Sequence, residues 1–177
     1  MTLARVVAAW GATDDDVRRP LPCDRLLPDA ELVVHRAVDV AAAPELVFRW
    51  LCQLRAAPYS YDLVDNFPRR SPRRLTPGLD RLVVGQPAMR IFHVVSFTRP
   101  EQITFISRAP LGRIAVTYAV IPRDDGAHLL MRLRWTPPTV PVGRRLFTRA
   151  VAVGDLVMAR RQLLNLKRLA ERDAAAP

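Results

Sequence analysis

Asp155 and Gln162 are two polar residues on an otherwise apolar helix face, and they are the strongest candidates for chemistry in this chain. At about 100° per residue, one side of a helix gathers the apolar residues of this segment. They are Val151, Ala152, Leu156, Met158, Ala159, Leu163, Leu166, Leu169 and Ala170. A carboxylate and an amide in an apolar wall need hydrogen-bonding partners, which a bound molecule can supply. Alternatively, Asp155 lies near the helix start, where backbone donors or an arginine satisfy it.

Arg36 and His93 are two further candidates on expected strands. Arg36 shares a face with Val34 and Val38, where its guanidinium could pair with Asp155 or hold an anionic ligand group. We expect solvent exposure on an edge strand instead. His93 shares a face with Met89, Ile91 and Val95, which is typical of a hydrogen-bonded core histidine. Contact with a ligand, or general-base catalysis, is the alternative for His93.

Three tyrosines and a methionine complete the candidate set. Tyr59 and Tyr61 lie in a long loop, where they could present hydroxyls at a pocket mouth or anchor the loop by their rings. Tyr118 lies on the apolar face of an expected strand. The predicted ligand-binding residues are therefore Tyr59, Tyr61, His93, Tyr118, Asp155, Met158 and Gln162.

The sequence shows no catalytic or metal-binding pattern. It lacks a Ser-His-Asp order, paired glutamates, a phosphate-binding glycine loop and metal-ligand spacing, and it contains only 7 glycines. Cys23 and Cys52 are isolated and are expected to be ordinary thiols. We therefore assign no catalytic residue, no metal and no cofactor.

Length and composition favour a single domain. The 177 residues, 50% of them hydrophobic, suffice for one sizeable core but would be cramped as two domains. Arg149 and Asp155 interrupt the most apolar tract, so no transmembrane segment is expected. The N-terminus does not resemble a signal peptide, which predicts a cytoplasmic location.

The net charge of +10 is carried almost entirely by arginine, since Lys167 is the only lysine. Together with abundant Ala, Val and Pro, this skew is typical of a GC-rich coding sequence rather than of a basic binding surface. The densest cluster, residues 69–74, has no interleaved aromatic side chains for base stacking, so no specific nucleic-acid partner is expected. Transient contact with an anionic membrane stays open.

Hydrophobic periodicity predicts the order of the elements. An irregular leader with at most one short helix spans residues 1–31 and packs on the domain; a strand follows at 32–40 and a helix at about 44–55. A proline-rich connection at 56–80 has the length of a lid or binding loop. From Leu82 onward, period-two segments and the turn Arg123-Asp124-Asp125-Gly126 predict an antiparallel meander with one wet face. A helix at 144–172 ends the domain.

Several motifs along the chain resemble one superfamily. In the N-terminal half they are Trp10-Gly11-Ala12-Thr13-Asp14, Pro20-Leu21-Pro22, Ala43-Pro44-Glu45 and Trp50-Leu51-Cys52-Gln53-Leu54. Later come Tyr59-Ser60-Tyr61-Asp62, Asp65-Asn66, Val84-Gly85, Met158-Ala159-Arg160-Arg161-Gln162-Leu163, Lys167-Arg168 and Ala170-Glu171. Nearly the whole chain thus resembles START-like, Bet v 1-like helix-grip proteins, the SRPBCC group of polyketide cyclase/dehydrase and lipid-transport type proteins. Cys23, in place of an expected glycine, and the arginine-rich stretch 69–74 depart from this pattern.

The resemblance implies an α+β fold, in which a curved antiparallel sheet wraps a long C-terminal helix around an internal apolar cavity. It implies a hydrophobic small-molecule partner such as a lipid, polyketide or isoprenoid. Because the superfamily includes carriers, enzymes and regulators, we expect a carrier or binder. A cyclase/aromatase-like or hydrolase-type enzyme and an interaction module are the alternatives; the sequence does not indicate an oligomeric state.

Overall fold

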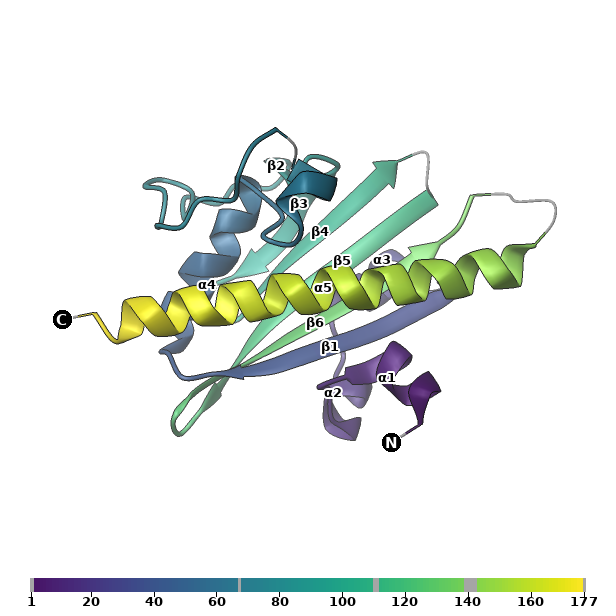
Figure 1. The fold of residues 1–177 in the computed structure, drawn as a ribbon, viewed down its shortest axis with the longest axis horizontal. Coiled ribbons are helices and arrows are strands. Elements are labelled where there is room, and N and C mark those ends of the chain that lie inside the picture. The colour runs from purple at the N-terminus through teal and green to yellow at the C-terminus, as the bar shows by residue number, and fades with distance from the viewer. Residues whose placement is uncertain (1, 67, 110–111, 139–142, 177) are drawn as a thin grey trace.

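A six-stranded antiparallel sheet forms the main body of the protein in a computed structural model, which describes residues 2–66, 68–109, 112–138 and 143–176. The strands are β1 (Leu32–Val40), β2 (Pro87–Ala88), β3 (Phe92–Thr98), β4 (Gln102–Ala109), β5 (Gly112–Arg123) and β6 (Gly126–Thr136). They are arranged in the order β1-β6-β5-β4-β3-β2. The long helix α5 (Arg144–Ala174) lies across one face of this curved sheet (Figure 1). The predicted α+β architecture is confirmed.

The inner core lies between the sheet and two helices. Helix α4 (Pro44–Cys52) begins with a proline at its first position, which suits a helix start, and continues into a 3-10 turn at Gln53–Arg55. Trp50 and Leu51 of α4 are fully buried, as are Phe105 of β4 and Leu163 of α5. Alternating residues of β3 to β6 point into this core, because successive strand side chains face opposite sides.

The β5–β6 hairpin turns within two residues. Arg123 pairs with Gly126 across the predicted turn. Gly126 has φ of +149°, and a β-carbon at this position would lie 2.2 Å from the carbonyl oxygen of Val40. Only glycine fits where this turn passes the end of β1.

The N-terminal segment is more regular than the sequence predicts. It forms the helices α1 (Leu3–Ala9), α2 (Asp14–Arg18) and α3 (Pro22–Leu26), of which α3 lies on the side of the sheet away from α5 (Figure 1). The residues of this outer apolar cluster are Leu21, Cys23, Leu27, Ala37, Ala115, Ala119 and Leu130. The expectation of a wet outer face was therefore wrong in this region, because the short helices cover it.

Polar contacts attach the N-terminal segment to β6. Arg132 is buried and donates to Asp24 at 2.6 Å and to the carbonyl oxygens of Asp16 and Val17 at 2.8 and 3.0 Å. The two ring nitrogens of His128 lie 2.6 Å from Asp39 and 3.0 Å from Asp16. These side chains replace water on the outer face, so the helices and the sheet are held as one unit.

Asp16→Asn should weaken this attachment and change its pH dependence. Burial alone would raise the pKa of Asp16, but hydrogen bonds from Thr13 and the nearby His128 hold the pKa below the ordinary 3.8. Because the folded pKa is the lower one, the carboxylate stabilises the fold above about pH 4 and loses this effect as the pH falls through the folded pKa. We expect a loss of about 1–3 kcal/mol at neutral pH and a flatter acid limb in urea unfolding. Identical pH profiles of wild type and variant would contradict this role.

Candidate functional site

A cavity of about 210 Å³ lies between α5, the sheet and the segment that follows α4. Its lining is mostly apolar and consists of Pro58, Ser60, Met89, Ile91, Phe92, Val116, Tyr118, Met131, Leu133, Asp155, Met158, Ala159 and Gln162. Four of the seven predicted ligand-binding residues, namely Tyr118, Asp155, Met158 and Gln162, meet here. A few polar groups in an apolar hollow are the usual composition of a small-molecule site.

Gln162 connects the sheet to the segment that covers the cavity. Its Oε1 accepts a hydrogen bond of 2.5 Å from the Tyr118 hydroxyl, and its Nε2 donates to the carbonyl oxygen of Pro58 at 2.6 Å. One turn later on α5, Asn165 donates to the carbonyl oxygen of Tyr59 at 2.8 Å. We call these two bonds from α5 to consecutive carbonyls the amide clasp. Burial, with Asp155 nearby, raises the pKa of Tyr118, so its phenol stays protonated and donates at neutral pH.

Asp155 forms a buried ion pair with Arg36. The Arg36 side chain is fully buried, and it donates to Asp155 Oδ2 and to the carbonyl oxygen of His35, both at 2.8 Å. Burial raises the pKa of Asp155 to about 6, against the opposing effect of Arg36. Among the described residues, Asp155 Oδ1 accepts no hydrogen bond, so one carboxylate oxygen in the cavity wall remains available.

Two expectations about this pair are corrected. Arg36 is not solvent-exposed on its edge strand, because it points beneath α5, where pairing with Asp155 compensates its charge. Asp155 does not lie near the helix start, since α5 begins about three turns earlier, at Arg144. The backbone donors of a helix N-terminus are therefore out of its reach, and Arg36 is its partner.

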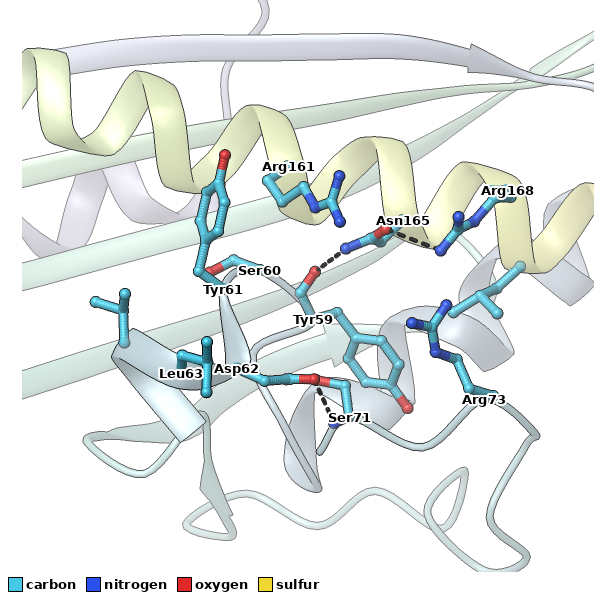
Figure 2. Close-up of a pocket in the computed structure, with 12 residues that line it drawn as sticks. Tyr59, Ser60, Tyr61, Asp62, Leu63, Ser71, Arg73, Arg161, Asn165 and Arg168 are labelled. Carbon is cyan, nitrogen blue, oxygen red and sulfur yellow. Dashed lines mark hydrogen bonds between the residues drawn. The ribbon is translucent and has the colours of Figure 1, made fainter. Parts of the chain in front are cut away.

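Tyr59 and Tyr61 lie in a neighbouring hollow of about 280 Å³ (Figure 2). The Tyr59 ring is buried and packs edge-on against Trp50 at 6.0 Å, and its hydroxyl has no hydrogen-bond partner among the described residues. Tyr61 is 39% exposed, and its ring lies 5.7 Å from the Arg161 guanidinium. Ser60, between the two tyrosines, lines both hollows. The two tyrosines thus border the cavity without lining it.

His93 is exposed on the outer side of β3, so its predicted face is reversed. Val94 is fully buried and Phe92 lines the cavity. Met89 and Arg90 have φ of +43° and +66°, so the chain before β3 is not extended and the alternation cannot be extrapolated from Met89. Phe92 was missed as a lining residue, although its apolar character next to His93 was the available signal.

The described residues contain no group of three or more His, Cys, Asp and Glu side chains that could hold a metal ion. Within the same residues, no helix is long and apolar enough to cross a membrane.

Similarity to known proteins is found at the level of structure. No protein-family model and no curated protein matches the chain. A solved structure from Nitrosomonas europaea has a TM-score of 0.55 at 15% identity, covering 84% of this chain and 99% of that chain. The di-domain ARO/CYC protein StfQ, from the steffimycin biosynthetic pathway, has a TM-score of 0.50 at 15% identity, covering 86% of this chain and 54% of that chain.

This chain has the START-like helix-grip fold. At such identities the likeness is one of fold. A solved structure from Thermus thermophilus is also similar, with a TM-score of 0.50 at 16% identity, covering 81% of this chain and 99% of that chain. The helix-grip fold places α5 against the concave side of the sheet, where the cavity lies.

Asp155→Ala should destabilise this helix-grip protein by about 3–5 kcal/mol near neutral pH, because it leaves the Arg36 guanidinium buried without its counter-charge. Urea unfolding measures the loss. The double variant Arg36→Met, Asp155→Leu removes both charges and should recover most of it. A double variant as unstable as the single one would show that the ion pair itself, and not the unpaired charge, determines stability.

Gln162→Leu should loosen the cover of the cavity, because it leaves the Tyr118 hydroxyl and the Pro58 carbonyl without their partner. We expect a loss of about 1–3 kcal/mol and faster amide hydrogen exchange at residues 59–61. Asn165→Leu is the matched comparison and should have the smaller effect, because it removes the bond to the Tyr59 carbonyl and an exposed bond from Arg168 but leaves the bonds of Gln162 in place. Exchange rates equal to wild type in both variants would rule out the amide clasp as the element that holds the cover.

Proposed function

We propose that this helix-grip protein binds a small, mostly apolar molecule that carries a hydrogen-bond donor, in the cavity beneath α5. The observation that supports this most is the Oδ1 of Asp155, which accepts no bond from a described residue in an otherwise apolar wall. A ligand hydroxyl or amine could donate to this oxygen, and a hydrogen bond to a charged acceptor in a mostly apolar wall is stronger than one between neutral groups. The side-chain amide of Gln162 is already bonded to the Pro58 carbonyl and the Tyr118 hydroxyl. Asp155 is therefore the residue that offers a ligand a hydrogen-bond acceptor.

The volume restricts the size of the ligand. A dry cavity of about 150 Å³ holds benzene, so about 210 Å³ would suit a molecule of one or two rings. A larger ligand requires the covering segment to move. Tyr59, Met89 and Arg90 all have φ in the left-handed region, which is uncommon for such residues, and all three lie next to the cavity. Backbone strain of this kind gathers at ligand-binding elements.

A comparison of naphthol with naphthalene tests the proposal. Naphthol should bind about tenfold more tightly above pH 7, because its hydroxyl can donate to the Asp155 carboxylate. This advantage should shrink as the pH falls through about 6, where Asp155 becomes protonated, while naphthalene binding stays constant. Fluorescence titration across this range gives both affinities. Absence of saturable binding by either probe would reject the cavity as a binding site, and a pH-independent ratio would reject Asp155 as the acceptor.

A cyclase-type enzyme is the second candidate function. A carboxyl group with a pKa of about 6 can accept and return a proton near neutral pH, and Asp155 shares the cavity with the Tyr118 phenol. The fold is also that of the ARO/CYC protein StfQ. Turnover of an aromatic polyketide precursor that Asp155→Asn abolishes, with binding retained, would favour the enzyme over the binder.

A further inference from the structure

The hollow beside the cavity carries an excess of positive charge. Arg161 and Arg168 come from α5, and Arg73 comes from the segment between η2 (Asp62–Asn66) and β2. Figure 2 shows the three guanidinium groups with Asn165 among them. We call this hollow the arginine pocket. None of its three arginines forms an ion pair with a described residue: Arg161 lies over the Tyr61 ring, and Arg168 donates to Asn165 at 3.2 Å.

The acidic residue that lines the arginine pocket, Asp62, forms no ion pair with these three arginines, and its single charge leaves them in excess. It accepts hydrogen bonds from the hydroxyl and the backbone nitrogen of Ser71, at 2.5 and 3.0 Å. Both carboxylate oxygens are therefore committed to Ser71, on the opposite side of the pocket from α5 in Figure 2. The three arginines are exposed, so their guanidinium groups can turn toward the hollow, and an anion there would accept charge-assisted hydrogen bonds from them.

The arginine pocket adjoins the cavity at two places, the covering segment and α5. Ser60 lines the two hollows, and the carbonyls of Pro58 and Tyr59 beside this boundary are held by the amide clasp. On α5, Met158 and Gln162 face the cavity, and Arg161 faces the arginine pocket within the same turn. A molecule in the cavity therefore has positive charge within one helical turn of its wall.

We propose that the arginine pocket binds the oxyanion, a carboxylate or a phosphate, of a ligand whose apolar body occupies the cavity. The guanidinium fork matches both groups, because two parallel N–H bonds fit two oxygens of either. This inference rests on the proposed function and narrows it, since the mostly apolar ligand with a hydrogen-bond donor would also carry an anionic head group. The source of the oxyanion is either a free ligand or the head of a membrane lipid.

Phenylhexanoate and phenylhexanol, which differ at the head group alone, separate this inference from the proposed function. Wild type should bind phenylhexanoate about tenfold more tightly at low ionic strength. Arg73→Gln, Arg161→Gln and Arg168→Gln should each weaken phenylhexanoate binding about threefold, with phenylhexanol unchanged. Arg149→Gln is the matched control, because Arg149 is an exposed arginine of α5 outside both hollows. Melting temperatures equal to wild type confirm that the variants are folded.

The outcomes are distinct. Equal affinity of wild type for both probes, or an equal loss in Arg149→Gln, would overturn the oxyanion site while leaving cavity binding intact. Failure of both probes to bind would remove the proposed function itself. Binding to phosphatidylcholine vesicles with and without phosphatidylglycerol tests whether the oxyanion belongs to a lipid head or to a free ligand. Binding to the anionic vesicles that phenylhexanoate displaces assigns the pocket to a lipid head, and phenylhexanoate binding without vesicle binding assigns it to a free ligand.

Discussion

The arrangement of the candidate site depends on the buried ion pair between Arg36 and Asp155. This pair joins the edge strand β1 to the middle of α5, at a place where a single charge would be very costly. The pair fixes which side of α5 faces the sheet, and therefore which residues line the cavity. The same carboxylate holds Arg36 with one oxygen and presents the other to the cavity, so structural and binding roles meet in one side chain.

The covering segment is held by polar bonds to α5 and by the buried ring of Tyr59, while its tip is exposed. Leu63 and Val64 at its tip are 84% and 75% exposed, whereas the carbonyls of Pro58 and Tyr59 are bonded to α5. Opening the segment would break two side-chain hydrogen bonds of about 1 kcal/mol each and would expose the Tyr59 ring, whereas the tip at Leu63 and Val64 has little buried surface to lose.

Much of the fold could be predicted from the sequence, because long, periodic segments such as β1 and α5 are buried on one side. The three N-terminal helices could not, because each is at most 7 residues long and such short helices depend on contacts with the rest of the protein. In the candidate site, Asp155 and Gln162 stood out because they interrupt an apolar face, and the pairing of Arg36 with Asp155 was among the alternatives considered, whereas the partners of Gln162 could not be deduced from spacing. His93 was assigned to the wrong face because the backbone at 89–90 leaves the extended region. The arginine pocket combines Arg73 of a loop with two residues of a helix, and such a convergence becomes visible only once the chain is folded.

The covered outer face of the sheet has a kinetic consequence. Because α3 and the buried network around Arg132 occupy that face, flattening the sheet to enlarge the cavity would cost buried contacts, and one route for exchange of a bound molecule passes the segment that Gln162 and Asn165 hold. Along this route, residence time depends on the two amide hydrogen bonds from α5, and affinity depends on the groups of the other walls. Evolution of this protein could therefore change how long it keeps a molecule without changing which molecule it keeps.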